Sequence, residues 1–308
     1  MKKFYYNNAR QPDLVELPTP RSGCWIHVVE PDEHELELIS QEFNLDLDQL
    51  RDAVDPYEAP RVEQEDGSVY VFTRYYNPNG VEVVTEPLLV IYMSDYIMTV
   101  QRKSTTVLDR LLSGSGGVIT SKKTKTLLQI LEEVNASYRH RIYRVSKQIM
   151  GIRTKMNKVE VRNEDFIRFI DLEEELNDFL SALLSQSVMY RSLLSGKHVR
   201  LYEEDKDLIE DLSLDTAELI ELAKSRIKTI SNTREAYSTI MANTLNSTFK
   251  RLTSISIFMT IPAITAGLYG MNLKLPFQGK AYAFWLILLI VMGLTTATVW
   301  LFRRKNWL

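Results

Sequence analysis

Two uncharged hydrophobic runs near the end of the chain restrict its fold more than any other feature. The first covers residues 252–273 and the second 281–302, and neither contains Asp, Glu, Lys or Arg. Each run has about 22 residues, which is enough for a helix to cross the ~30 Å hydrocarbon layer of a bilayer. Buried helices of soluble domains, the alternative, rarely stay uncharged over this length. We therefore expect two membrane spans.

The charges beside these runs predict the orientation of the chain. The basic residues are Lys250 and Arg251 before the first run, and Arg303, Arg304 and Lys305 after the second. Because basic flanks stay on the cytoplasmic side, we expect both termini in the cytoplasm. The N-terminus has no apolar run typical of a secretory signal, and the single Cys24 suits a reducing compartment. A net charge of -3 favours cation handling over nucleic-acid binding.

Residues 1–120 have the pattern of an α/β domain. Short runs of β-branched and aromatic residues at 24–29, 68–76, 86–93 and 96–101 predict strands. Between the first two, residues 31–45 have the apolar spacing of a helix that begins at Pro31 and Asp32. The glycine-rich stretch at 113–117 lacks the spacing of a phosphate-binding loop, so we interpret it as a break.

Helical periodicity replaces the strand pattern beyond residue 120. Residues 121–200 predict an antiparallel helical pair, and residues 201–251 predict a stalk helix. No proline occurs in this third pattern before Pro262, so the stalk should continue through the first span, 252–273. An external loop, 274–280, a second span, 281–302, and a basic tail, 303–308, complete an α+β fold with membrane-spanning helices.

The first span is unusually polar for a helix that faces only lipid. Taking every third or fourth residue from Asn246 to Gly267 gives a narrow stripe. Most of its side chains are hydroxyl, amide or small groups, and two, Phe249 and Leu252, are bulky. The remaining members of this stripe are Asn246, Thr253, Ser256, Thr260, Ala263 and Gly267. Such residues favour helix contacts or a wet cavity. One hairpin cannot enclose a pore, so a pore would require a homo-oligomer with these helices at its axis.

The first span ends in the sequence Tyr269-Gly270-Met271-Asn272. Gly270 can take backbone angles that end a helix, and Asn272 offers a neutral carboxamide oxygen. Mg²⁺ loses its water reluctantly, so a ring of amide and carbonyl oxygens suits the hydrated ion. The same four residues also fit an ordinary helix end and turn, and the chemistry of the residues leaves both interpretations open.

Three stretches in the same order resemble the CorA family of divalent-cation transporters. They are "WIHVVEPDEHELELIS", "DAVDPYEAPRVEQEDG", and "YGMN" between two spans that precede the tail "RRKNWL". The resemblance covers essentially the whole chain. It implies a funnel-shaped homopentamer in the plasma membrane, with an N-terminal α/β/α cytoplasmic domain and the first span lining a pore for magnesium.

The resemblance also implies roles for individual residues. Gly270, Met271 and Asn272 would form the selectivity filter, and Phe249 and Leu252 a hydrophobic gate. Asn246, Thr253, Ser256, Thr260, Ala263 and Gly267 would line the pore, and Arg303, Arg304 and Lys305 would form a basic ring. Mg²⁺ bound between subunits at Asp211, with Asn77 at the partner position, would close the pore.

Other functions remain as alternatives. The loop "LKLPFQGK" carries two lysines and no acidic residue, which leaves room for a zinc, cobalt or nickel transporter of the same superfamily. From another class, the hairpin could anchor a scaffold or sensor. We expect no enzyme and no organic cofactor, because the four histidines are scattered without metal-ligand spacing. Passive influx is sufficient, since a divalent ion gains about 4.6 kcal/mol across 100 mV.

Overall fold

The computed structural model describes residues 1–78, 84–114, 116–157, 163–271, 280 and 282–305. These residues form two compact units, Met1–Ser231 and Asn232–Leu308. The first unit contains a sheet and most of the helices, and the second contains the apolar segments. Each unit is described by itself below.

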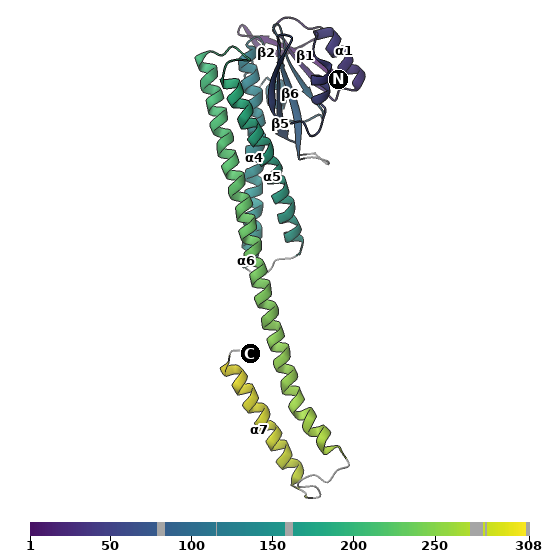
Figure 1. The fold of residues 1–308 in the computed structure, drawn as a ribbon, viewed down its shortest axis with the longest axis vertical. Helices are drawn as coiled ribbons and strands as arrows, with labels where there is room; N and C mark the ends of the chain where they lie inside the picture. Colours follow the sequence, from purple (N-terminus) through teal and green to yellow (C-terminus); the bar gives the residue numbers. More distant parts are fainter. Residues whose placement is uncertain (79–83, 115, 158–162, 272–279, 281, 306–308) are drawn as a thin grey trace. The chain divides into compact units, whose positions relative to one another are not determined.

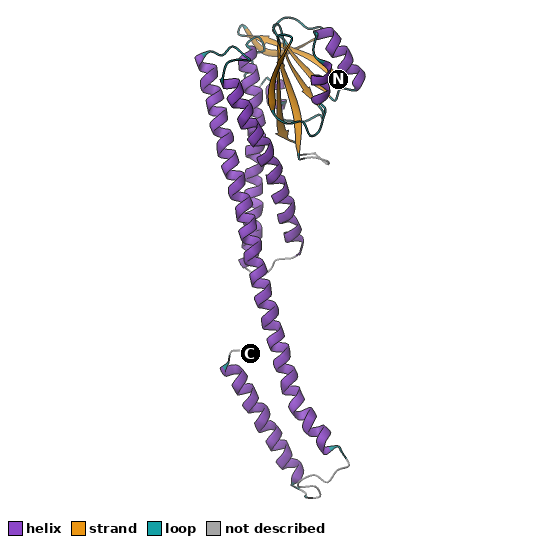
Figure 2. Cartoon of the chain, in the orientation of Figure 1, coloured by secondary structure: helices purple, strands orange, loops and turns teal. Residues whose placement is uncertain are grey.

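A seven-stranded sheet is the centre of the first unit (Figure 2). Its strands are β1 (Lys2–Asn8), β2 (Gln11–Leu17), β3 (Trp25–Val29), β4 (Arg61–Glu65), β5 (Ser68–Tyr76), β6 (Thr85–Tyr92) and β7 (Ile97–Gln101). Their order in the sheet is β2-β1-β3-β7-β6-β5-β4. Neighbouring strands are antiparallel except β3 and β7, which are parallel.

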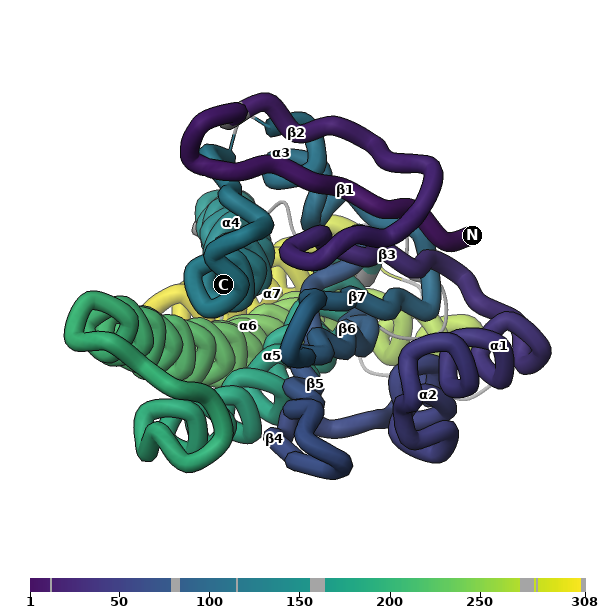
Figure 3. Tube along the Cα trace, turned by 90° about the horizontal axis from the view of Figure 1, so that it is seen from above, coloured from purple at the N-terminus to yellow at the C-terminus, as the bar shows by residue number. Residues whose placement is uncertain are grey.

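Helices cover both faces of this sheet, because the central strands are apolar on both sides. Along β5, Val69 and Val71 enter one core, whereas Tyr70 and Phe72 enter the other. The helices α1 (Glu33–Phe43) and α2 (Leu47–Asp52) pack on the second face, and longer helices cover the first (Figure 3). The α/β/α layering implied by the resemblance is therefore confirmed.

The expected helix near residue 32 is confirmed, and its start has a local cause. The side chain of Asp32 accepts a hydrogen bond from the Glu35 amide, and the Glu35 side chain accepts one from the Asp32 amide. Asn44 ends the helix in the left-handed conformation, with φ of 51°. The start of α1 is thus fixed by polar side chains, and its end by the left-handed backbone of Asn44, whose main-chain amide donates to the Ser40 carbonyl.

Four helices follow the sheet and the short α3 (Asp109–Leu112): α4 (Lys123–Asn157), α5 (Asn163–Leu194), α6 (Glu203–Tyr269) and α7 (Ala283–Arg304). In the first unit, α4 and α5 run beside the initial part of α6 (Figure 1). Aromatic rings join α4 and α5 to the sheet, because Phe179 lies edge-on to Tyr138 and to Tyr76, with ring centroids 5.2 and 5.6 Å apart.

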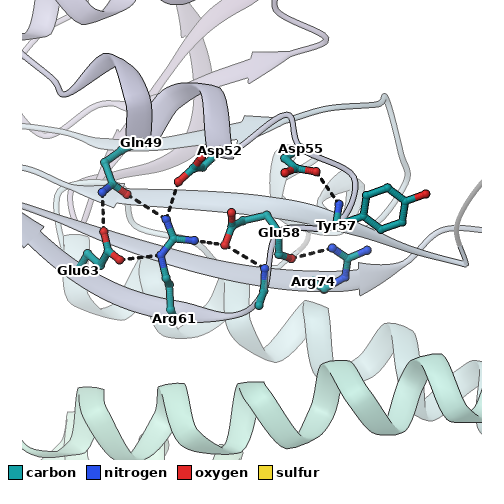
Figure 4. A network of polar contacts seen from close by, with 9 residues as sticks. Gln49, Asp52, Asp55, Tyr57, Glu58, Arg61, Glu63 and Arg74 are labelled. Atoms are coloured by element: carbon teal, nitrogen blue, oxygen red, sulfur yellow. Dashed lines mark hydrogen bonds and ion pairs between the residues drawn. The ribbon is translucent and has the colours of Figure 1, made fainter.

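A network around Arg61 fixes the segment that contains the sequence "DPYEAP" (Figure 4). The Arg61 guanidinium donates to Asp52 at the end of α2, to Glu58, and to Glu63 on β4. Its carbon centre lies 3.9 Å above the Phe72 ring. Arg74 of β5 donates to the main-chain oxygens of residues 56 and 58. This part of the family-like motif therefore holds α2, a loop and two strands together.

The second unit contains the two segments expected to span a membrane. In the part of the chain that the structure describes, two helices, α6 and α7, are long and apolar enough to cross a bilayer. Helix α6 continues without a break through Pro262, so the expected continuity of stalk and first span is confirmed. Within this unit α7 packs beside the end of α6, where the rings of Phe258 and Phe302 are 5.5 Å apart.

We predict that Phe179→Ala destabilises the first unit by about 3–5 kcal/mol, because it leaves a cavity between two tyrosine rings. Urea unfolding of the full chain in detergent, followed by limited proteolysis, measures this loss. Val188→Ala on the same helix is the control, since Val188 is 58% exposed and its truncation should change stability by less than ~0.5 kcal/mol. Equal effects of the two substitutions would contradict the assigned core.

Candidate ion pathway along the first span

The C-terminal part of α6 buries one side against α7. Ser254 is fully buried, and Ile257, Phe258, Ile261 and Thr265 are less exposed than their neighbours. At about 100° per residue these five positions lie on one face of the helix. The contact between Phe258 and Phe302 identifies α7 as the element that covers this face.

The stripe recognised in the sequence lies on the opposite side of α6. Its eight members are all exposed in the single chain: Asn246, Phe249, Leu252, Thr253, Ser256, Thr260, Ala263 and Gly267. Helical geometry places their mean direction more than about 120° from the face covered by α7. The structure thus brings these residues together on one surface that α7 leaves open.

Hydroxyl groups on this surface are already oriented by the helix. Ser256 Oγ donates to the Leu252 carbonyl at 3.0 Å, and Thr260 Oγ1 donates to the Ser256 carbonyl at 2.7 Å. Each hydroxyl has one proton, so only oxygen lone pairs remain for other partners. The water molecules around a cation direct their hydrogens outward. The surface therefore offers acceptors that match the hydration shell of a cation.

The end of α6 is formed differently from our expectation. The helix ends at Tyr269, but the φ of Gly270 is not positive, so a left-handed glycine is not what ends it. Instead the Gly270 amide donates to Ala266, and the Met271 amide donates to Leu268 at 3.3 Å, which tightens the last turn. A Cβ on Gly270 would lie 3.2 Å from the Ala266 carbonyl oxygen. Asn272 lies outside the described residues.

Three basic residues end the second span. Arg303 and Arg304 form the last turn of α7, and the amide of Lys305 closes the helix on Leu301 at 3.1 Å. All three side chains are exposed, and the Arg304 guanidinium lies 5.5 Å from the centre of the Trp300 ring. Cations are favourable at a helix C-terminus. This cluster is compatible with the basic ring that the resemblance implies.

The two residues expected to bind a regulatory ion lie in the first unit. Asp211 is exposed on α6 and lines a groove of about 450 Å³ with Glu132 and Asp215. Asn77 is buried directly after β5, where its main-chain N–H donates to the Val84 carbonyl. Among the described residues, no three acidic, histidine or cysteine side chains are grouped to hold a metal ion. A site at Asp211 would thus need ligands from another subunit.

Sequence reasoning did not single out a second acidic surface, on α5. Asp171, Glu174 and Asp178 line a cavity of about 550 Å³ that faces the loop held by Arg61. Burial raises the pKa of the Asp178 carboxyl, Glu174 adds to this effect, and Arg74 opposes it. The sequence could have revealed this surface, because the three acidic residues are spaced by three and four positions, which places them on one face of a helix.

The fold is that of a two-span membrane protein with a large N-terminal α/β/α domain and a polar stripe on its first apolar segment. The sequence model of the CorA-like Mg²⁺ transporter protein family matches residues 21–304. The chain belongs to this family. Since its members are transporters of magnesium and other divalent cations, the chain is a transporter rather than an enzyme, as the sequence predicted.

Individual relatives extend over nearly the full chain. A cobalt/magnesium transport protein CorA from Methanocaldococcus jannaschii is 25% identical, over 92% of this chain and 91% of its own length. A magnesium transport protein CorA from Campylobacter jejuni is 20% identical, over 96% and 94%. The complete structure of the CorA magnesium transporter from Methanocaldococcus jannaschii has a TM-score of 0.84 at 20% identity and covers 100% of this chain and 99% of its own.

We predict that cysteines at positions 256 and 260 react at least about tenfold faster with a hydrophilic cationic thiol reagent than a cysteine at position 254, because only the exposed stripe adjoins water. The variants are Ser256→Cys, Thr260→Cys and Ser254→Cys in the full chain in liposomes. The native Cys24 is fully buried and should give little background. Similar rates at all three positions would contradict a water-lined stripe.

Proposed function

We propose that this chain forms a homopentameric channel of the plasma membrane that lets Mg²⁺ enter the cytoplasm passively. The exposed polar stripe of α6, opposite its contact with α7, is the observation that carries the proposal. A polar surface inside a bilayer is unfavourable toward lipid and becomes favourable around water. Several copies of α6 around one axis would turn these stripes toward a shared pore, with the α7 helices outside.

The ion path in this assembly begins at the outer end of α6. A ring of Asn272 carboxamides, positioned by Gly270 and Met271, would bind hydrated Mg²⁺ through its water molecules. Asn246, Thr253, Ser256, Thr260, Ala263 and Gly267 would line the pore below this ring. Phe249 and Leu252, which are 61% and 60% exposed in the single chain, would form a hydrophobic gate.

Charge near the inner mouth fits the orientation with both termini in the cytoplasm. Basic residues precede the first span and follow the second, so by the positive-inside tendency Arg303, Arg304 and Lys305 would lie on the cytoplasmic side. The membrane potential supplies about 4.6 kcal/mol per divalent ion at 100 mV, so influx needs no other energy source.

Regulation by cytoplasmic Mg²⁺ would use the exposed Asp211. Its groove contains two further carboxylates, and one of them, Asp215, is paired with Arg139 at 2.6 Å. Asp211 is exposed beside them, with Lys125 also in the lining of the groove, and would share a cation with a neighbouring subunit, whose Asn77 region would supply oxygen ligands. Bound Mg²⁺ would hold the subunits together and keep the pore closed.

We predict that purified protein in liposomes increases Mg²⁺ entry, driven by an inside-negative potential, and that Asn272→Ala lowers it by roughly tenfold because the hydrated ion loses its ring of amides. Asn243→Ala is the matched control, since Asn243 is exposed on α6 away from the stripe and should retain normal flux. Mg²⁺ entry no faster than in empty vesicles would contradict the channel proposal and favour a membrane-anchored scaffold or sensor. Faster entry of Zn²⁺, Co²⁺ or Ni²⁺ than of Mg²⁺ would assign the chain to another substrate class.

We predict that Asp211→Ala raises, by about threefold or more, the internal Mg²⁺ concentration that halves the flux, because a ligand of the closing ion is lost. Glu210→Ala removes the same charge one position away and should leave this concentration unchanged. The measurement is flux into liposomes loaded with graded Mg²⁺. An unaltered closing concentration in Asp211→Ala would remove Asp211 from the gate.

A further inference from the structure

Four polar side chains are buried where α4, α5 and α6 meet in the first unit. They are Asn135 of α4, Gln186 and Tyr190 of α5, and Thr216 of α6, and none is more than 1% exposed. The buried residues around them on these helices are mainly aliphatic and aromatic. A polar cluster in such a core is unfavourable unless its members bond to one another.

Asn135 is the centre of this cluster. Its Oδ1 accepts from Gln186 Nε2 at 2.8 Å and from Tyr190 OH at 3.2 Å. Its Nδ2 donates to Thr216 Oγ1 at 3.0 Å and to the Leu212 carbonyl at 3.2 Å. One carboxamide thus connects α5 to both the backbone and a side chain of α6.

These bonds specify the register of α6 in a way that the apolar contacts do not. A shift of α6 by one turn, about 5.4 Å, would exchange one aliphatic contact for another. The same shift would bring another main-chain carbonyl to the place of the Leu212 carbonyl, but it would bring the aliphatic Leu212 or Ile220 to the place of Thr216. Asn135 would then lose its hydroxyl partner inside the core. A single buried polar residue is known to fix the register of paired helices in this way.

The cluster lies beside the residue to which we assign regulation. Leu212 directly follows Asp211, and one turn further along α4 Arg139 pairs with Asp215 of α6 at 2.6 Å. The two contacts therefore hold the α6 segment that carries Asp211 at adjacent turns. Helix α6 then continues without a break to Tyr269, so Asp211 and the proposed pore surface are carried by one helix.

We propose that Asn135 is a positioning residue that locks α6 in one register on α4 and α5, and thereby sets the internal Mg²⁺ concentration at which the pore closes. The link between Asn135 and pore closure rests on the proposed channel function and on Asp211 as a ligand. In this role Asn135 touches no ion. It determines where the Asp211 carboxylate lies relative to the neighbouring subunit.

The functional test uses Asn135→Leu and Thr216→Val, which remove the bonds while keeping side chains of related shape. We expect flux into Mg²⁺-free liposomes to stay within about twofold of the wild type, and the closing concentration to shift by about fivefold or more. Thr216→Ser keeps the hydroxyl and should restore the normal closing concentration. Thr120→Val is the control, because Thr120 is equally buried and bonded to Asn7 but makes no contact with this cluster.

A structural readout tests the register without relying on transport. Spin labels at Lys147→Cys on α4 and Lys228→Cys on α6, both exposed positions, report the distance between the two helices. Labelled chain is diluted with unlabelled chain so that only distances within one chain are measured. We expect one narrow distance with Asn135 present, and a broadened or shifted distribution in Asn135→Leu.

The outcomes separate this proposal from the channel function. An unchanged distance distribution in Asn135→Leu overturns the register lock. A shift of closing concentration that Thr120→Val reproduces overturns the link to gating, because it would then follow from any loss of a buried hydrogen bond in the first unit. If liposomes with the wild-type protein take up Mg²⁺ no faster than empty vesicles, the channel function is refuted. The spin-label distances would then still decide whether Asn135 fixes the register. A changed distance with an unchanged closing concentration would refute the link to gating.

Discussion

The structure depends on the requirement that backbone N–H and C=O groups have partners where no water is present. A segment in hydrocarbon can meet it only as a helix or a closed barrel, so the apolar part of α6 has to stay helical. Pro262 lacks an N–H and would bend or end many soluble helices. Here the helix runs through it to Tyr269, because a break would expose backbone groups to lipid.

Because α6 is continuous, residues with different roles are found on different faces of the helix and at different positions along it. In the second unit one face of α6 packs on α7 through Phe258, while the face with Ser256 and Thr260 stays open. In the first unit the same helix packs its apolar side on α4 and α5, and exposes Asp211. The continuity of α6 therefore places the residues proposed for conduction and for regulation on one element.

Sequence reasoning predicted the spans, the long helix, an α/β domain and the stripe, because hydropathy and helical period report burial directly. The α/β/α layering was implied only by the resemblance to the CorA family. It missed β1, β2 and β4. Strands β2 and β4 are the edges of the sheet; β2 is largely exposed and β4 is only partly buried, so they lack the apolar runs that identified β5 and β6. The sequence also could not predict the Asn135 cluster, because Asn135 and Thr216 are 81 residues apart and only the fold brings them together. Asn272 and the pore roles stay predictions.

The neutral character of the stripe is itself an argument about mechanism. Residues 252–273 contain no carboxylate, although a carboxylate would attract a divalent cation more strongly than a hydroxyl or an amide. Strong attraction in a low-dielectric pore would hold the ion, whereas conduction requires binding weak enough to release it. Hydroxyls whose protons are used by the helix, as in Ser256 and Thr260, give only weak acceptors for bound water. Such a surface favours passage of an ion that keeps its hydration shell, and Mg²⁺ retains that shell more firmly than Ca²⁺ does.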